Sequence, residues 1–172
     1  MTRTDSGPDD TIAPVKSIRA PIGITYEWSA GPSNATWIAG LLEGRLIARR
    51  CPVCRQVQVP PRGACPTCAV LLTDDVEVAH TGTITSFCVV NVPFLGQKIK
   101  IPYVAANILL DGADLPFQHL ILGVDSTEVR MGMRVKAVWK PRGEWGPTLE
   151  NIDHFEPSGE PDADFSTYAR YL

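Results

Sequence analysis

The sequence predicts a mainly β protein with an N-terminal arm and helix, a rubredoxin-like zinc ribbon, and a C-terminal five-stranded OB-fold barrel. Three observations lead to this class: two Cys-x-x-Cys pairs, an apolar helical stripe before them, and short β-rich runs after them. The 172 residues, 44% hydrophobic and 20% charged, have the composition of a globular chain of one or two domains. The expected divisions are an arm over 1–33, a helix over 34–49, a ribbon over 50–75, a barrel over 76–156 and a tail over 157–172.

The arm and the helix differ in their periodicity. Proline and glycine interrupt residues 1–33, although the stretch 18–28 is apolar enough to predict contact with the body or with a partner. Asn34 is the expected N-cap of the helix. The apolar residues that follow at helical spacing are Trp37, Ile38, Leu41, Leu42, Leu46 and Ile47. Such a stripe usually packs on its own body, and the alternative is partner docking through Trp37 and Leu41.

Two cysteine pairs predict a metal site. Cys51 and Cys54 form the first pair, Cys65 and Cys68 the second, and ten residues separate the pairs. Each two-residue gap lets both thiolates reach one ion, and four thiolates fill a tetrahedral shell without leaving a position for an activated water. We therefore expect one structural zinc per chain. Rubredoxin-like iron and a dithiol redox motif are the alternatives for the same ligand set.

The remainder of the chain alternates short apolar runs with turn residues. The predicted strands are 76–92, 103–110, 118–124, 135–140 and 148–155, with Gly82 as a bulge or bend inside the first. Five strands in about 80 residues are typical of a small Greek-key barrel. Alternation places Cys88 on the side of Ile84, so we expect it in the core. Paired acids such as Asp74–Asp75 are expected in turns.

Several motifs, taken in order, resemble one known family. They are LLEGRL at 41–46, RCPVC at 50–54, VPPR at 59–62, CPTC at 65–68, GTITSF at 82–87 and PYVAANI at 102–108. The sequence is similar to the zinc-ribbon/OB-fold family of acyl-CoA-associated proteins, formerly a domain of unknown function, over about residues 34–156. Family members often have glycine after the second cysteine of each pair, where this chain has Arg55 and Ala69. Since glycine there eases a positive φ, its absence predicts local strain without loss of a ligand.

The resemblance implies a non-catalytic accessory subunit in a hetero-oligomer. Members of the family accompany thiolase-like enzymes (thiolases, retro-aldolases or acyltransferases) that act on coenzyme A thioesters. Some of these enzymes take part in the degradation of steroid side chains. The partner would carry the chemistry. The chain itself has no nucleophile and base at a suggestive spacing, and we expect structural roles for its three histidines, His80, His119 and His154.

Two segments are candidates for contact with acyl-CoA or with the partner. The segment 91–100 lies between the first two predicted strands, where OB-folds usually have a binding loop. Phe94 and Leu95 can border an acyl chain or a partner, while Lys98 and Lys100 can meet phosphate; a solvated hairpin is the alternative. In the tail, Tyr168 and Tyr171 belong to a short helical pattern that predicts partner docking.

Charge argues against the main rival function, single-stranded nucleic-acid binding. Residues 34–142 carry a net charge of +4 and residues 143–172 a net charge of −6, and the net charge of the chain is −3. Phe87, Tyr103 and Trp139 could stack on bases, but this balance is poor for holding phosphates. The N-terminus does not resemble a secretory signal, and the longest uncharged apolar run, 103–110, is too short to span a membrane. We therefore expect a cytoplasmic protein with neither nucleic acid nor membrane as a partner.

Overall fold

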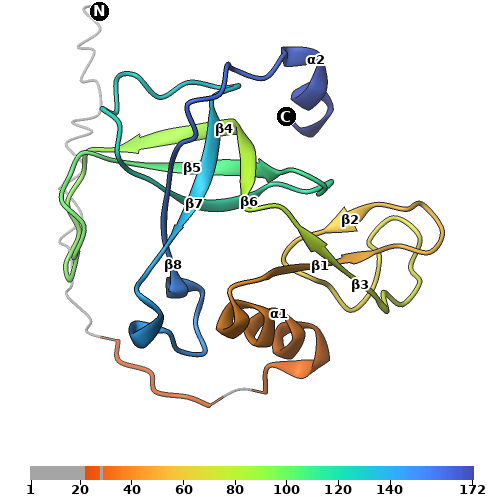
Figure 1. Ribbon diagram of the computed structural model, residues 1–172. Helices are drawn as coiled ribbons and strands as arrows, with labels where there is room; N and C mark the ends of the chain where they lie inside the picture. The colour runs from red at the N-terminus through yellow and green to blue at the C-terminus, as the bar shows by residue number, and fades with distance from the viewer. Residues whose placement is uncertain (1–21, 28) are drawn as a thin grey trace, which may run out of the picture.

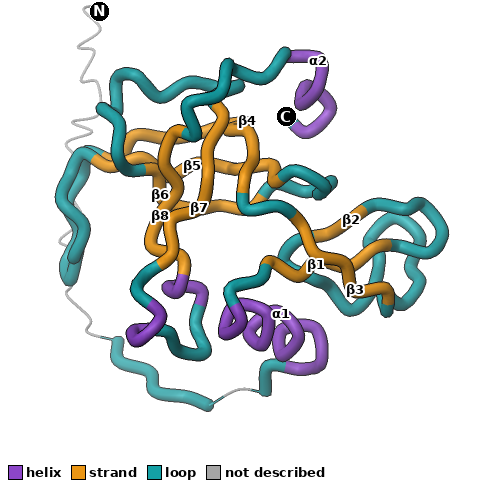
Figure 2. The backbone as a smooth tube through the Cα atoms, in the orientation of Figure 1, coloured by secondary structure: helices purple, strands orange, loops and turns teal. Residues whose placement is uncertain are grey.

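The computed structural model describes residues 22–27 and 29–172, and it confirms the predicted fold class (Figure 1). A helix is followed by a three-stranded sheet, which projects to one side of a closed five-stranded barrel, and a short helix ends the chain (Figure 2). Most of the predicted arm, residues 1–21 and residue 28, lies outside the described residues. The elements are α1 (Gly31–Glu43), β1 (Leu46–Arg50), β2 (Val57–Gln58), β3 (Asp74–Val78), β4 (Thr81–Val90), β5 (Tyr103–Leu110), β6 (Phe117–Ile121), β7 (Arg134–Trp139), η1 (Arg142–Glu144), η2 (Leu149–Asn151), β8 (Ile152–Pro157), α2 (Phe165–Tyr168) and η3 (Ala169–Tyr171).

Helix α1 is shorter than the predicted helix 34–49. Gly44 adopts a left-handed conformation with φ 76°, and the N–H of Arg45 donates to the carbonyl of Gly40 at 2.9 Å, which closes the helix. The expected N-cap is also wrong, because the helix begins after Ala30 rather than after Asn34. Leu46 and Ile47 continue the apolar stripe in sequence, but they lie in β1.

The first sheet has the order β2-β1-β3, and both neighbours of β1 are antiparallel to it. Its arginines pair with acids of β3: Arg49 Nε lies 2.6 Å from Asp75 Oδ1, and Arg45 Nε lies 2.8 Å from Glu77 Oε2. Asp74 also pairs with Arg50, at 3.5 Å. The turn predicted at Asp74–Asp75 is therefore wrong, because cross-strand pairing with Arg50 and Arg49 lets both of these acids lie in β3.

The barrel closes in the order β4-β5-β6-β8-β7. At Gly82 a side chain would not fit, because an added Cβ would lie 2.6 Å from the carbonyl oxygen of Leu109 on the neighbouring strand. The predicted bulge occurs between Ile84 and Ser86 instead. Beyond this irregularity the alternation changes and β4 extends past the core, so Cys88 is exposed and its predicted core position is wrong.

A single apolar core joins the helix, the inner end of the first sheet and the barrel. Trp37 and Leu41 of α1 are 6% and 0% exposed, and they pack in the same cluster as Leu46 of β1 and Phe155 of β8. The two α1 residues therefore belong to the core, as amphipathic stripes usually do, and are not available to a partner. The outer end of the sheet has a separate small cluster formed by Cys51, Cys65 and Leu72.

The connection between β7 and β8 is fastened to α1 by one buried amide. Asn151 is 1% exposed; its Nδ2 donates to the carbonyls of Leu41 at 3.2 Å and Gly146 at 2.9 Å, and its Oδ1 accepts from the N–H of Gly146 at 2.9 Å. Nearby, the ring of Trp145 covers Gly44, where an added Cβ would lie 2.8 Å from it. These contacts hold the connection, and hence the residues 149–153 that follow, against the end of the helix.

The C-terminal tail forms the predicted short helical segment, but it packs on its own chain. Arg130 and Arg134 pair with Asp162 and Glu160, and the N–H of Ala163 donates to the carbonyl of Gly132 at 2.8 Å. Arg134 also binds Asp111 at 2.6 Å, and this hydrogen bond lowers the pKa of the Asp111 carboxyl. The tail thus covers one end of the barrel.

No helix within the described parts of the chain combines the length and apolar character that a membrane crossing requires.

Replacing Asn151 tests the attachment of the β7–β8 connection. We expect Asn151→Ala to lower the free energy of unfolding by about 3 kcal/mol, because it removes the acceptor of the half-buried Gly146 N–H, the donor to the buried carbonyl of Leu41, and the packing of a fully buried side chain. Urea denaturation checks this, with Asn91→Ala as the control, since the Asn91 side chain is exposed and makes one long bond of 3.4 Å. A loss below about 1 kcal/mol would contradict the role assigned to Asn151.

Candidate functional site

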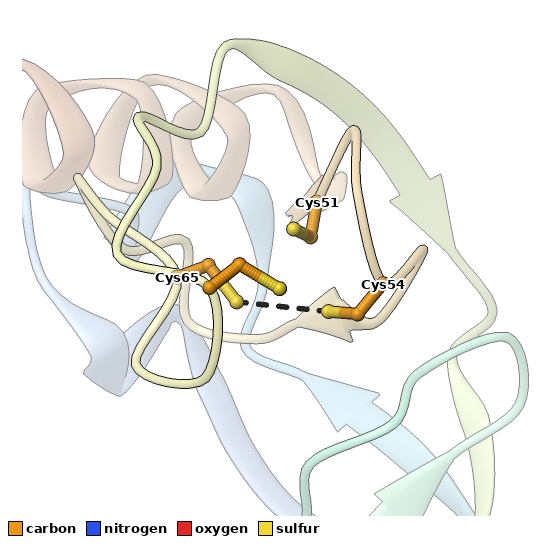
Figure 3. Close-up of side chains that lie close together, drawn as sticks. Cys51, Cys54 and Cys65 are labelled. Carbon is orange, nitrogen blue, oxygen red and sulfur yellow. Dashed lines mark hydrogen bonds between the residues drawn. The ribbon is translucent and has the colours of Figure 1, made fainter.

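Four cysteines converge at the outer end of the ribbon. Their sulfur atoms all lie within 4.8 Å of one another, and Cys54 Sγ lies 3.6 Å from Cys65 Sγ (Figure 3). Sulfurs arranged tetrahedrally about a zinc ion at about 2.3 Å would be separated by nearly 4 Å, so the arrangement matches one ion at its centre. The predicted set of Cys51, Cys54, Cys65 and Cys68 is therefore brought together and is positioned to bind a metal.

The two knuckles have the same backbone hydrogen bonds. The N–H of Arg55 donates to the carbonyl of Cys51 at 3.1 Å, and the N–H of Ala69 donates to that of Cys65 at 2.9 Å. Both residues have positive φ, 65° for Arg55 and 55° for Ala69. The strain predicted from the missing glycines is confirmed, because these residues take the conformation that glycine adopts without a steric penalty.

The electrostatics of the four thiols suit a cation. Burial opposes ionisation of Cys51, but the backbone N–H groups of Cys54 and Val53 outweigh it and lower the pKa of Cys51 to about 6. Burial and the neighbouring thiols, Cys54 first, raise the pKa of Cys68 to about 12. The negative charge of the Cys51 thiolate thus opposes ionisation of the Cys68 thiol. A divalent ion at the centre of the four sulfurs would offset this repulsion between negative charges.

Sequence reasoning missed a buried amide beside the metal centre. Gln58 of β2 is 0% exposed, and its Nε2 lies 3.7 Å from Cys65 Sγ. An amide N–H directed at a thiolate stabilises its charge and fixes its orientation. Only the alternation of β2 could have indicated this residue, and a two-residue strand gives too short a pattern to read.

A cleft of about 520 Å³ lies between the β4–β5 loop, β6 and the start of β8; we call it the loop cleft. Its lining is mostly apolar, with two lysines, two acidic residues and one histidine. The residues are Phe94, Gly96, Gln97, Lys98, Ile99, Tyr103, His119, Leu120, Lys140, Leu149, Glu150, Ile152 and Asp153. Burial lowers the pKa of His119, whose ring packs edge-on against Phe155 with centroids 5.5 Å apart.

The four predicted loop residues separate into two groups. Phe94 and Lys98 line the loop cleft, whereas Leu95 and Lys100 do not. Leu95 is 103% exposed and Phe94 is 60% exposed. Sequence reasoning found the loop but missed the opposite wall, because Lys140, Leu149 and Ile152 come from a distant part of the chain and have no motif of their own.

The docking residues predicted in the tail make intramolecular contacts. Tyr168 is 5% exposed and packs on Gly132, and Tyr171 Oη donates to Asp114 at 2.9 Å. Because these contacts occupy Tyr168, it is not available for the predicted partner docking. Tyr171 is half-buried by its bond to Asp114.

Side chains considered for other functions have structural partners. Trp139 contacts the rings of both His80 and Trp145, with centroids 5.3 Å from each, and these rings would compete with a base for its surface. His80 Nδ1 accepts from Trp139 at 3.2 Å, and His154 pairs with Asp153 at 2.7 Å.

Ala69→Gly tests the strain in the second knuckle. We expect it to stabilise the metal-loaded protein by about 0.5–1 kcal/mol, because glycine adopts the positive φ without a steric penalty. Thermal unfolding of the metal-loaded protein measures this. Ala64→Gly is the matched control, since Ala64 is exposed in the same loop and is not among the positive-φ residues. Equal effects of the two changes would contradict the assignment.

Comparisons with known proteins agree with this geometry. Residues 39–71 match the model of the ChsH2 rubredoxin-like zinc ribbon domain, and residues 75–140 match that of the ChsH2 C-terminal OB-fold domain. A probable enoyl-CoA hydratase alpha subunit of Thermomonospora curvata is 32% identical over 106 residues, which cover 62% of this chain. This chain spans about a third (33%) of the length of that relative.

Two solved structures share the architecture. A chain of the Ltp2-ChsH2(DUF35) aldolase is 28% identical with a TM-score of 0.57, covering 73% of this chain and 94% of that one. A DUF35 protein of unknown function from Sulfolobus solfataricus is 23% identical with a TM-score of 0.53, covering 63% and 78%, and supports the fold alone. Since the two domain models together match more than half of the residues in the same order, the chain belongs to the ChsH2-type (DUF35) family of zinc-ribbon/OB-fold proteins.

Proposed function

We propose that this chain is a non-catalytic accessory subunit that binds and completes a thiolase-like enzyme acting on acyl-CoA thioesters. The partner would be a thiolase, a retro-aldolase or an acyltransferase, and it would supply the catalytic groups. The observation that carries the proposal is the match of both domains, in order, to ChsH2, which in a solved relative forms part of an aldolase with Ltp2. Among the three classes of partner, that relative favours a retro-aldolase, with steroid side chains as a candidate substrate.

The loop cleft supports contact with an acyl-CoA. Its apolar lining suits an acyl or pantetheine chain, and Lys98 can meet phosphate as a point charge. Lys140 pairs with Glu150 at 3.8 Å and would exchange that partner for phosphate. A cleft of about 520 Å³ is within the range of small-molecule sites. His119, whose pKa is lowered by burial, can exchange a hydrogen bond with a carbonyl or hydroxyl group of the ligand.

The exposed tip of the same loop supports contact with the partner. Leu95 projects fully into solvent outside the cleft, and Lys100 is also exposed. A fully exposed leucine at a loop tip offers apolar surface that a pocket on another protein can cover. We therefore divide the loop between a ligand-facing pair, Phe94 and Lys98, and a partner-facing pair, Leu95 and Lys100.

One structural zinc per chain completes the proposal. When bound to the four cysteines it would close a tetrahedral shell and supply folding free energy to the ribbon, with no open position for catalysis. The ribbon's own buried cluster consists of two cysteines and a leucine, which is too small to hold the lobe without the ion.

The division of the loop predicts opposite effects for neighbouring substitutions. Phe94→Ala should weaken acyl-CoA binding by the complex about tenfold, because it removes an apolar wall of the loop cleft. Leu95→Ala should leave that affinity unchanged and weaken subunit association instead. Isothermal titration with an acyl-CoA and with the purified partner separates the two effects. An unchanged acyl-CoA affinity in Phe94→Ala would remove the loop cleft from the ligand site.

Co-purification tests the function itself. The tagged chain, expressed in its native host, should retain a thiolase-like enzyme in near-equal amount and contain one zinc per chain. Mass spectrometry identifies the enzyme, and omitting this subunit should lower its activity on acyl-CoA thioesters. Recovery of nucleic acid, or of iron with redox partners, would contradict the proposal.

A further inference from the structure

Three parts of the chain meet at the carboxylate of Asp114, in the turn between β5 and β6. Its Oδ2 accepts from the N–H of Val57 in β2 at 2.9 Å, while its own N–H donates to the carbonyl of Val57 at 2.8 Å. Its Oδ1 accepts from Tyr171 Oη at 2.9 Å and from Arg170 Nη2 at 3.0 Å. One side chain of the barrel thus contacts both the ribbon and the C-terminal segment.

The position of Val57 depends on the metal centre. Val57 follows the first knuckle, in which the N–H of Cys51 donates to the carbonyl of Gln56 at 2.9 Å. The next residue, Gln58, contacts Cys65 Sγ at 3.7 Å. Strand β2 has only two residues and, among the described strands, pairs with β1 alone; the side chains of Val57 and Val59 are buried in the main core, while the knuckles and Asp114 hold its backbone. Loss of the ion from the four cysteines would therefore leave the backbone of Val57, although not its buried side chain, free to shift.

The last residues of the chain, like the backbone of β2, are held in place partly by Asp114. Segment η3 spans Ala169–Tyr171, and a helix of this length has no stability of its own. Tyr168, one residue earlier, is held differently because it packs on Gly132 of the barrel. The tail therefore has a barrel-held part, up to Tyr168, and a part held through Asp114, which comprises Arg170 and Tyr171.

We infer that metal binding in the ribbon and docking of Arg170 and Tyr171 are coupled through Asp114. In the metal-free protein β2 no longer holds the carboxylate in place, and the end of the chain detaches while Tyr168 stays on the barrel. By thermodynamic reciprocity, loss of the Tyr171 contact weakens metal binding. This coupling is independent of the proposed function, since it concerns the isolated chain and requires neither acyl-CoA nor a partner.

Fluorine NMR tests the coupling directly. The chain has four tyrosines, at 26, 103, 168 and 171, so uniform 3-fluorotyrosine labelling gives four signals that single Tyr→Phe changes assign. On removal of the metal with a chelator, we expect the Tyr171 signal to move to the position of an exposed tyrosine. The signals of Tyr168 and Tyr103 should stay unchanged, since both residues lie against the barrel.

Each other outcome overturns the inference. An unchanged Tyr171 signal after confirmed loss of the metal would show that the two sites are independent. Joint movement of the Tyr168 and Tyr171 signals, with or without that of Tyr103, would show unfolding of the tail or of the whole chain without a selective role for Asp114.

Metal affinity supplies the reciprocal test. Tyr171→Phe removes only the hydroxyl that donates to Asp114, and it should weaken zinc binding between about twofold and tenfold in a competition assay with a chromogenic chelator. Tyr26→Phe is the matched control, because Tyr26 is 73% exposed and far along the chain from the metal centre. Equal zinc affinities for the two variants would overturn the coupling.

Discussion

Convergence of four cysteine sulfurs on one point is the constraint on which the ribbon depends. The buried cluster around them contains Cys51, Cys65 and Leu72, which cannot offset the conformational entropy of more than twenty residues. The knuckles also hold Arg55 and Ala69 in a strained backbone conformation. An ion held by the four cysteines would supply the folding free energy that a lobe with so small a cluster of its own, and with strained knuckles, does not get from packing.

The barrel and the helix rest on a different interaction, the burial of apolar surface. Trp37 and Leu41 of α1 share one core with strands on both sides of the barrel, and Asn151 ties the β7–β8 connection to the helix end. This connection forms one wall of the loop cleft, and the β4–β5 loop forms the other. Contacts with the helix end therefore hold one wall in place, while the opposite wall is a loop that projects toward solvent with Leu95 fully exposed. Such an arrangement suits a surface that a second protein completes.

Much of the fold was predictable because local patterns were unbroken. The strand predicted at 103–110 matches β5 residue for residue, since its apolar run is interrupted only by Asn107 and is bounded by Pro102 and by Asp111 and Gly112. The metal ligands followed from spacing alone, and the missing glycines correctly indicated positive φ at Arg55 and Ala69.

The wrong predictions fall where one local sequence pattern is compatible with two different structures. Leu46 and Ile47 fit the helical stripe, but the left-handed turn at Gly44 places them in a strand. A bulge before Ser86 reversed the prediction for Cys88. The opposite wall of the loop cleft and the contacts of Tyr168 join residues distant in sequence, and no local periodicity encodes such contacts.

Amide-resolved NMR of the isolated chain, with and without zinc, tests the central claim that the metal builds the ribbon on a barrel that folds by itself. On chelation, signals from residues 51–72 should lose their dispersion, while those from the barrel strands, residues 81–157, keep theirs. Ribbon signals that stay dispersed without metal would contradict the claim, and so would collapse of the barrel signals together with those of the ribbon.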